Sequence, residues 1–401
     1  MDKETLSNYG WIVICVLVLA VMIALATPFG SFVSQAVQNT TKGLFSTNQN
    51  ALDAAGIAIP GQDFDVTDMG NTPPDPALNP DSGEEVYDGM IYIHGDYEYR
   101  YNMSYYDDLW AIEETGWSSN PSQNGWGVYY KGNDEEPGPI LESINGAPIT
   151  TVEYTFHMAT KMTKAPAIPK TVTSMDGAFS RCYALRESPE IPHGVTSMGW
   201  TFYYSGLRTA PVIPNTVTYM VSTFEESALE VAPVIPESVT EMAQIFRGCS
   251  SLKNAPAIPS GVTDLRYAFK NCSSLKVAPD LSKATNLNNL ANTFSGCTSL
   301  EVAPIIPESV TYMGSTFYNC KRLKTAPAIP ENVTNIDEAF YGCEKLTGTI
   351  VIDTTKLGTK YPGTGYEKCF YGTKNAITIT GNCPTLAEIA ATANSGNVTV
   401  Q

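Results

Sequence analysis

The sequence predicts a repeat solenoid, preceded by an N-terminal hydrophobic helix and a small β module. The first observation behind this prediction is a phenylalanine that recurs at steps of 22, 23 or 25 residues, with one last step of 30. The second is a shared pattern around it, A-P-x-I-P-x-x-V-T-x-M-x-x-x-F-x-[GN]-C-x-x-L. The third is that one unit cannot bury its own apolar residues, so neighbouring units must stack into a continuous core. The recurring residues are Phe156, Phe179, Phe202, Phe224, Phe246, Phe269, Phe294, Phe317, Phe340 and Phe370.

Each part of the unit has a structural interpretation, seen in APAIPSGVTDLRYAFKNC (residues 255–272). The V-T-x-M stretch is β-branched and short, which predicts a strand. F-x-x-C places two apolar residues one helical turn apart, which predicts a short helical turn with both side chains facing inward. Gly or Asn stands just before the cysteine position, as in Gly248 and Asn271. Both residues tolerate a positive φ, so the chain is expected to reverse there in a left-handed conformation.

The A-P-x-I-P stretch carries two prolines and is expected to be extended or polyproline-like, because proline removes ladder donors. Leu252, Ala255 and Ile258 lie three apart and are expected to face the core. The residue between the prolines then faces outward, as an apolar stripe of the kind that binds a partner. The alternative is that this stripe is shallowly covered or too narrow to bind. The stripe comprises Ala167, Glu190, Val212, Val234, Ala257, Ile305 and Ala328.

A second candidate surface consists of tyrosines that follow the recurring phenylalanines. Single exposed tyrosines are common, so this set is a weaker candidate than the stripe. Its members are Tyr203, Tyr204, Tyr318, Tyr341 and Tyr371.

Six cysteines occupy one repeat position and are predicted to form a buried column of free structural thiols. Disulfide or metal binding is the alternative, but Ser205 and Ser227 replace two members of the column without other adjustment. Cys369 and Cys383 lie outside the column and could pair in an oxidising compartment. The column comprises Cys182, Cys249, Cys272, Cys297, Cys320 and Cys343.

These units resemble bacterial surface leucine-rich repeats of the BspA type, which share I-P, V-T-x-I/M, A-F and G-C-x-x-L elements. The stretch AIPSGVTDLRYAFKNCSSL (residues 257–275) carries the likeness, which extends over residues 144–373. The resemblance implies a curved, non-enzymatic solenoid at a cell surface, and some such proteins act as adhesins. The added A-P is a departure that breaks the usual strand on one face.

Residues 1–50 are predicted to form a hydrophobic and amphipathic helix, because residues 11–26 are an uninterrupted apolar run. One interpretation is a membrane anchor, since neighbouring residues extend the run towards the length of a span. A cleaved signal peptide is another, because Ala24-Leu25-Ala26 fits the cleavage rule. The third is an assembly helix, since TLSNYGWIVIC (residues 5–15) resembles the start of Flp/Tad-type pilins.

Residues 51–83 are predicted to be a proline-rich linker, and residues 84–143 an acidic, aromatic β module that caps the solenoid. Residues 90–94 and 97–101 alternate around Gly95-Asp96, which predicts a hairpin, and residues 125–131 are a third strand candidate. The aromatic residues are interpreted as the module's core. The alternative is a sugar-binding or calcium-binding surface made with the neighbouring acids.

The solenoid is assigned to residues 144–373 and a C-terminal cap to residues 374–401. Within the cap, residues 376–380 alternate as a strand, residues 385–393 read as a short helix, and residues 397–400 as a final strand. The absence of a C-terminal sorting signal leads us to expect attachment through the N-terminus.

The net charge of −17 argues against a nucleic-acid partner, and a segment of net charge −13, residues 75–145, holds most of the acidity. The three histidines His94, His157 and His193 share no motif, so no catalytic, metal or cofactor site is predicted. We therefore expect a non-enzymatic cell-surface protein, anchored in the membrane by its N-terminal helix, that binds a protein or matrix ligand. The alternative is a pilin-like subunit that forms a homo-oligomeric filament through that helix.

Overall fold

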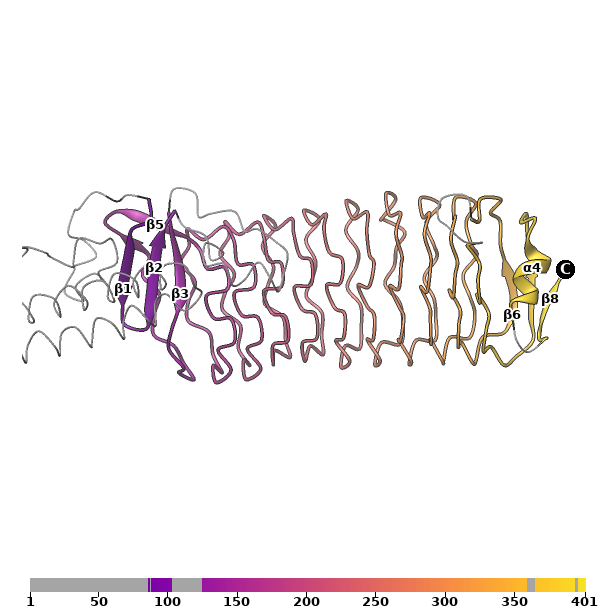
Figure 1. Cartoon of the computed structure of the whole chain (residues 1–401), viewed down its shortest axis with the longest axis horizontal. Helices are drawn as coiled ribbons and strands as arrows, with labels where there is room; N and C mark the ends of the chain where they lie inside the picture. The colour runs from indigo at the N-terminus through magenta and orange to yellow at the C-terminus, as the bar shows by residue number, and fades with distance from the viewer. Residues whose placement is uncertain (1–85, 87, 103–124, 359–364, 394–395) are drawn as a thin grey trace, which may run out of the picture. The chain divides into compact units, whose positions relative to one another are not determined.

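The structure is a computed structural model, and it describes residues 86, 88–102, 125–358, 365–393 and 396–401. The described residues form a row of coils that stack side by side, with a small sheet at each end of the row (Figure 1). The repeat solenoid predicted from the sequence is therefore present.

The N-terminal sheet has five strands in the order β1-β2-β3-β5-β4. Strands β1 (Ile91–His94) and β2 (Tyr97–Tyr101) form the predicted hairpin around Gly95-Asp96. Strand β3 (Trp126–Tyr130) pairs with β2 in antiparallel register, as the third strand candidate. The side chains of Tyr97, Tyr99 and Trp126 are buried, so they serve as the core of this sheet.

The sheet does not end at residue 143, where the sequence placed a domain boundary. Strands β4 (Ser143–Ile144) and β5 (Ala147–Thr151) belong to it, and β5 runs parallel to β3. The amide of Tyr130 donates to the carbonyl of Thr155, and the Thr155 hydroxyl donates to the carbonyl of Val128. The module is thus hydrogen-bonded directly to the first coil and covers its end.

A single stack of phenylalanine rings runs through the core of the coils. The ten recurring phenylalanines are fully buried, and consecutive rings lie 5.3–5.8 Å apart with interplanar angles of 2–27°. Each ring therefore contacts one ring above and one below, which sets the register between neighbouring coils. We number positions in a coil from its phenylalanine, so that the cysteine is at +3 and the stripe at −12.

Around the phenylalanine, backbone amides alternate between two kinds of acceptor. In one coil the amides of Gly177, Phe179 and Arg181 donate to carbonyls of the next coil, at 2.6–2.8 Å. The intervening amides of Ala178 and Ser180 donate three residues back within their own coil. Every amide from −4 to +3 is satisfied except the one at −3, which needs a separate partner.

This alternation explains why the strand and helical turn expected here are replaced by irregular turns. The V-T-x-M stretch forms only isolated parallel bridges at position −5, for example Ser174 with Ser197. Position +2 is left-handed as predicted, with φ of 75° at Gly248 and 63° at Asn271. Position −2 is also left-handed, although Trp200 and Glu338 stand there with φ of 51° and 53°. A left-handed residue on each side of the phenylalanine turns every second amide towards the next coil.

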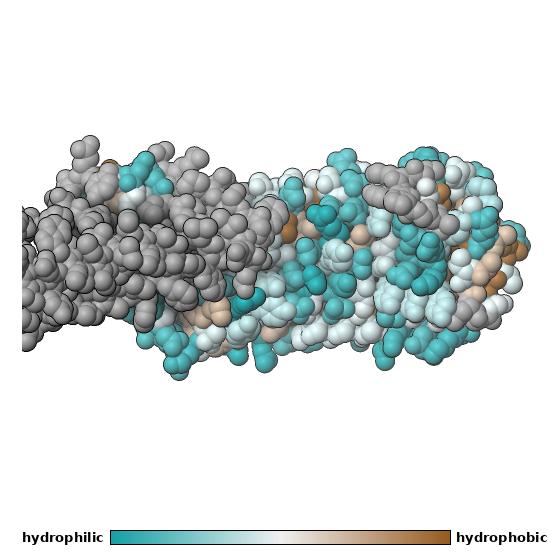
Figure 2. Space-filling model, in the orientation of Figure 1, coloured by the Kyte–Doolittle hydropathy of each residue, from teal (hydrophilic) through white to brown (hydrophobic). Residues whose placement is uncertain are grey.

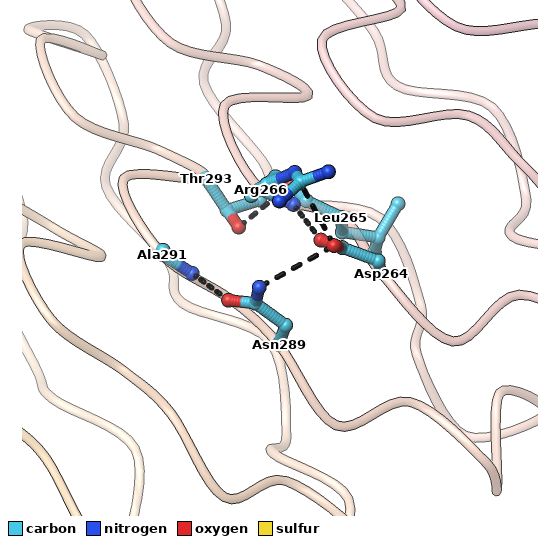
Figure 3. Close-up of polar contacts among 6 residues, drawn as sticks. All are labelled: Asp264, Leu265, Arg266, Asn289, Ala291 and Thr293. Carbon is cyan, nitrogen blue, oxygen red and sulfur yellow. Dashed lines mark hydrogen bonds and ion pairs between the residues drawn. The ribbon is translucent and has the colours of Figure 1, made fainter. Parts of the chain in front are cut away.

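In several coils a side chain at position −5 supplies the partner for the remaining amide, as Figure 3 shows for two neighbouring coils. Asp264 Oδ1 accepts from the amide of Arg266 at 2.8 Å, and Asn289 Oδ1 accepts from the amide of Ala291 at 2.9 Å. The amide group of Asn289 donates in turn to Asp264 Oδ2, which links the two coils. Such Asx turns satisfy a backbone amide without a strand. Buried threonines at −1 add a second link, since Thr293 donates to the carbonyl of Leu265 at 2.9 Å.

The A-P-x-I-P stretch has no strand, as its prolines predict. Neighbouring coils are bridged there at single residues, mostly at position −15, as in Val302 with Thr325. In the 25-residue unit the equivalent residue is Val277, which bridges Val302. Leucine and isoleucine side chains of this stretch point into the core, where Leu252 and Ile258 are 0% and 2% exposed. Residues three apart share a face, as in a polyproline-like helix.

A three-stranded parallel sheet closes the C-terminal end, in the order β6-β7-β8. Strands β7 (Ile377–Thr380) and β8 (Val398–Val400) and helix α4 (Leu386–Ala391) fall where the sequence predicts them. Strand β6 (Gly348–Val351) was not predicted; it follows the coil of Phe340 in the chain. The buried side chains of Leu386 and Ile389 attach α4 to this end.

The predictions for residues 1–50 and for the linker 51–83 lie outside the described residues. Within the part of the chain that the structure describes, no helix is long and apolar enough to cross a membrane.

Candidate functional site

All seven stripe residues are exposed. The three largest apolar members, Val212, Val234 and Ile305, are 88%, 86% and 85% exposed. Such exposure of branched apolar side chains costs hydration free energy and has no role in packing these coils. The stripe is interrupted where Glu190 and the equivalent Asp280 stand.

A second row of apolar side chains runs beside the stripe at position −15. Val231 and Val302 stand at this position and Val277 at its equivalent in the 25-residue unit; they are 56%, 52% and 57% exposed. The three-residue period that turns Leu252 and Ile258 inward also turns positions −15 and −12 outward together. This second row was missed from the sequence, although the same period could have indicated it.

The first proline of each unit does not face outward with the stripe residue that follows it. Pro233, Pro279 and Pro304 are buried, and Pro211 and Pro256 are half-buried. The polyproline-like backbone gives each of these prolines a different face from the stripe residue beside it. The exposed apolar surface is therefore two rows of side chains, at −15 and −12, over a floor of proline and alanine.

The two rows border a cavity of about 440 Å³ between the coil of Ile305 and the coil of Ala328. Its floor consists of Pro304, Pro327 and Ile329. Three carboxylates lie at its rim: Glu308, Glu331 and Asp353. An apolar floor with an acidic rim suits a side chain that has an apolar stem and a positive end.

Exposed ion pairs border the rows at position −16, where Glu230 contacts Arg208 and Lys253 at 3.6 and 3.1 Å. These pairs are solvent-screened and contribute little stability. The face of the molecule in Figure 2 is mostly hydrophilic, with apolar atoms gathered mainly near the C-terminal end. On the coloured part of this face, extended apolar surface is therefore the exception.

The second candidate set, the tyrosines, divides into two groups. Tyr318, Tyr341 and Tyr371, all at position +1, stack face to face, with ring centroids 4.7 and 5.1 Å apart. Tyr203 and Tyr204 are adjacent in sequence and meet edge to face at 4.6 Å. The first group is half-buried.

The cysteines of the column are fully buried free thiols. Each donates from Sγ to the carbonyl of the phenylalanine in the preceding coil, at 3.0–3.1 Å, as Cys272 does to Phe246. Serine stands in the column at Ser205 and Ser227 without making this bond, since the buried Ser205 hydroxyl has no hydrogen-bond partner among the described residues and the Ser227 hydroxyl lies 3.4 Å from Cys249 Sγ. Burial raises the pKa of the thiol to about 12 in Cys182, Cys249 and Cys297, so these thiols stay protonated and unreactive.

Cys369 and Cys383 are also free thiols in this structure. Cys369 is buried one residue before Phe370, and the Cys383 thiol contacts the Thr385 hydroxyl at 3.3 Å. Among the described residues, no group of three histidine, cysteine or acidic side chains is placed to hold a metal ion.

Residues 150–276 and 221–347 match the family model of the BspA type leucine rich repeat region, in six copies. A solved leucine-rich repeat protein from Bacteroides ovatus is similar in fold. The two sequences are 21% identical, the match covers 71% of this chain and 74% of that chain, and the TM-score is 0.51. A leucine rich cell surface protein from Faecalibacterium prausnitzii matches at 20% identity over 72% of this chain and 94% of that one, with a TM-score of 0.36. The pneumococcal vaccine antigen PcpA matches at 14% identity over 79% of this chain and 99% of that one, with a TM-score of 0.31.

No curated protein matches the sequence significantly. None of these matches supports the resemblance of the N-terminal helix to pilins. The family match covers the same coils whose phenylalanine, cysteine and leucine positions were built up above. Residues 150–347 are thus a leucine-rich repeat array of the BspA type, and the chain belongs to the proteins that carry such repeats.

Proposed function

We propose that this chain is a non-enzymatic cell-surface protein whose coils present the apolar rows at −15 and −12 to a protein or matrix ligand. The observation that carries the proposal is the exposure of Val212, Val234 and Ile305 along one line of the array. Proteins in this family are commonly binding modules, and an exposed apolar row with a groove beside it is typical of a protein-binding surface.

Attachment to the cell belongs to the same proposal. The apolar run of residues 11–26 would anchor the chain in the membrane, and the proline-rich residues 51–83 would hold the coils away from it. Fractionation of cells that express the full chain, with N-terminal sequencing of the mature protein, tests this part. If all of the protein is recovered from the culture medium and lacks residues 1–26, the membrane anchor is ruled out.

The docking surface is tested by charging it. In the triple variant Val212→Glu, Val234→Glu and Ile305→Glu, the fold should be unchanged, because these side chains are 85–88% exposed and contribute little to packing. Binding of the purified full chain to cells and to immobilised matrix proteins should weaken at least tenfold, since each carboxylate would have to be desolvated in the interface.

A matched control charges apolar side chains outside the rows. Met158 and Tyr183 are 54% and 51% exposed, and the double variant Met158→Glu and Tyr183→Glu adds charge without touching positions −15 or −12. Binding should be retained in this control. Full binding by the triple variant, or equal loss in both variants, would refute the assignment of the surface.

A further inference from the structure

A second cavity, of about 330 Å³, lies at the phenylalanine turns and has a different chemistry from the groove beside the apolar rows. It runs across four consecutive coils, from Lys270 to Glu338. Tyr318 in its wall follows Ile305 by 13 residues, more than half of a 23-residue coil, so the two cavities lie on different parts of the coil.

The cavity exists because of a gap in the column of side chains at position +1. This column runs Arg247, Lys270, Ser295, Tyr318, Tyr341 and then Tyr371. Ser295 is small and 5% exposed, and Gly296 follows it, so nothing large separates Lys270 from Tyr318. One face of the Tyr318 ring is covered by Tyr341 at 4.7 Å, and its other face is turned towards this gap.

The lining is rich in groups that both donate and accept hydrogen bonds. Asn271, Asn292 and Asn319 line the cavity, and their amide side chains form no hydrogen bond with any other residue that the structure describes. The Oδ1 of Asn271 lies near Gly296 and the Oδ1 of Asn319 near Gly342, where the missing glycine side chains leave them room. Amides beside an aromatic face can bind the paired hydroxyls of a sugar ring.

The charges of the cavity are one cation and one anion at opposite ends. Within the described part of the chain, no carboxylate pairs with Lys270, and its ammonium group lies 5.1 Å from the centre of the Tyr267 ring. Partial burial, followed by the nearby Arg247, lowers the pKa of Lys270. Arg247 itself contacts Glu225 at 3.3 Å. At the far end, Glu338 accepts from the Ser315 hydroxyl at 3.4 Å.

From this arrangement we infer that the cavity binds a carboxylated saccharide, with the sugar ring stacked on the open face of Tyr318 and its carboxylate next to Lys270. A single unpaired cation suits one carboxylate, whereas a phosphate-rich ligand would need several cations and would be repelled by Glu338. An apolar ligand would leave the amides and the Ser295 hydroxyl without partners. The less polar face of a sugar ring packs on tyrosine, while its hydroxyls meet the amides.

The test measures binding of methyl glucuronide and methyl galacturonide to the full chain by NMR titration, with methyl glucoside as the neutral counterpart. We expect the unaltered protein to bind at least one of the two acidic glycosides more tightly than the glucoside. Lys270→Met should remove this preference. Ser295→Tyr should abolish binding by filling the gap, and position +1 accepts tyrosine in four other coils, so this variant should fold.

Tyr371→Ala is the matched control, because it shortens the tyrosine stack at the end away from the cavity and should leave the affinity unchanged. The triple variant of the apolar rows should also bind the glycoside normally, so failure of one proposal is distinguishable from failure of the other. The inference is overturned if neither acidic glycoside binds the unaltered protein, if Ser295→Tyr binds as well as the unaltered protein, or if Tyr371→Ala loses affinity as Ser295→Tyr does.

Discussion

The first coil contains a carboxyl group whose burial should make the stability of this region depend on pH. Glu153 and Asp176 stand at position −3 of neighbouring coils, and each accepts a hydrogen bond from a serine hydroxyl, of Ser174 at 2.6 Å and of Ser197 at 2.5 Å. Burial raises the pKa of Glu153 from 4.5 to about 7, against the lowering effect of Ser174, and the charge of Asp176 adds to the rise. Burial also raises the pKa of Asp176.

The direction of the change in stability with pH follows from the linkage between protonation and folding. Because the folded pKa of Glu153 lies above the unfolded value, the folded state is penalised wherever this carboxyl must ionise. The penalty is absent below pH 4.5, grows as the pH rises through about 7, and is complete above that value. A rise from 4.5 to about 7 corresponds to at most about 3 kcal/mol at 1.36 kcal/mol per pH unit.

Glu153→Gln removes the charge and keeps an oxygen that can accept from Ser174. The variant should therefore equal the unaltered protein near pH 4.5 and exceed it in stability at pH 8, by up to about 3 kcal/mol. Because repeat arrays can open locally, the assay is hydrogen exchange of the amides of Tyr154 and Phe156, which donate to the second coil.

Glu237→Gln is the control, with the opposite sign. The exposed Glu237 carboxylate accepts from the Ser260 amide and hydroxyl at 3.1 and 3.2 Å, and these bonds lower its pKa. That variant should lose stability at neutral pH, and the difference should vanish in acid. An equal effect of Glu153→Gln at pH 5 and pH 8 would show that the carboxyl ionises freely and would refute the reasoning.

Three other outcomes follow from the coil geometry. Phe269→Ala removes a ring whose centroid lies 5.6 and 5.7 Å from those of its two neighbours. Urea unfolding should show a loss of about 3–5 kcal/mol in the free energy of unfolding. Protection of backbone amides from hydrogen exchange should be lost first in the two adjoining coils. Gly248→Ala places a Cβ 2.2 Å from the Glu226 carboxyl carbon at a φ of 75°, and should cost about 1–2 kcal/mol in thermal unfolding. The six cysteines of the column should resist a thiol reagent at pH 8 in the native protein and react together in denaturant. Absorbance of the reagent's product counts the thiols that react. Fast reaction in the native protein would contradict their buried, protonated state.

The sequence was sufficient for those parts of the fold that a single residue type determines. Phenylalanine spacing predicted stacked units around a continuous core, and the ten rings are buried in that core. Gly248 and Asn271 predicted the left-handed turn at +2, because both residue types tolerate a positive φ; Arg181 and Tyr204 adopt the same turn in other coils without that local preference. The prolines predicted the lack of a strand beside the apolar rows.

The left-handed residues at −2 could not be predicted in this way. Trp200 and Glu338 have no local preference for a positive φ, and the conformation arises because their amides reach a carbonyl of the following coil, at 3.0 and 2.8 Å. The partner is 21 or more residues away, so the cause lies outside any local window. The same holds for the cavity at Tyr318, which depends on a small residue, Ser295, one coil away.

The hydrogen-bond ladder also gives the array a direction, which accounts for its two unlike ends. From the coil of Phe156 onward, the turn amides donate towards the C-terminus, so the first coil presents carbonyls and the last presents amides. At the N-terminal end, the Tyr130 amide of β3 donates to the Thr155 carbonyl as an earlier coil would. At the other end, the coil of Phe340 donates into the segment around Phe370, where the Tyr366 hydroxyl donates to Glu388 of helix α4. Uncapped ends of this polarity would be complementary and could join head to tail. The β module and the C-terminal cap therefore do more than shield apolar side chains: each occupies the surface through which one array could extend another.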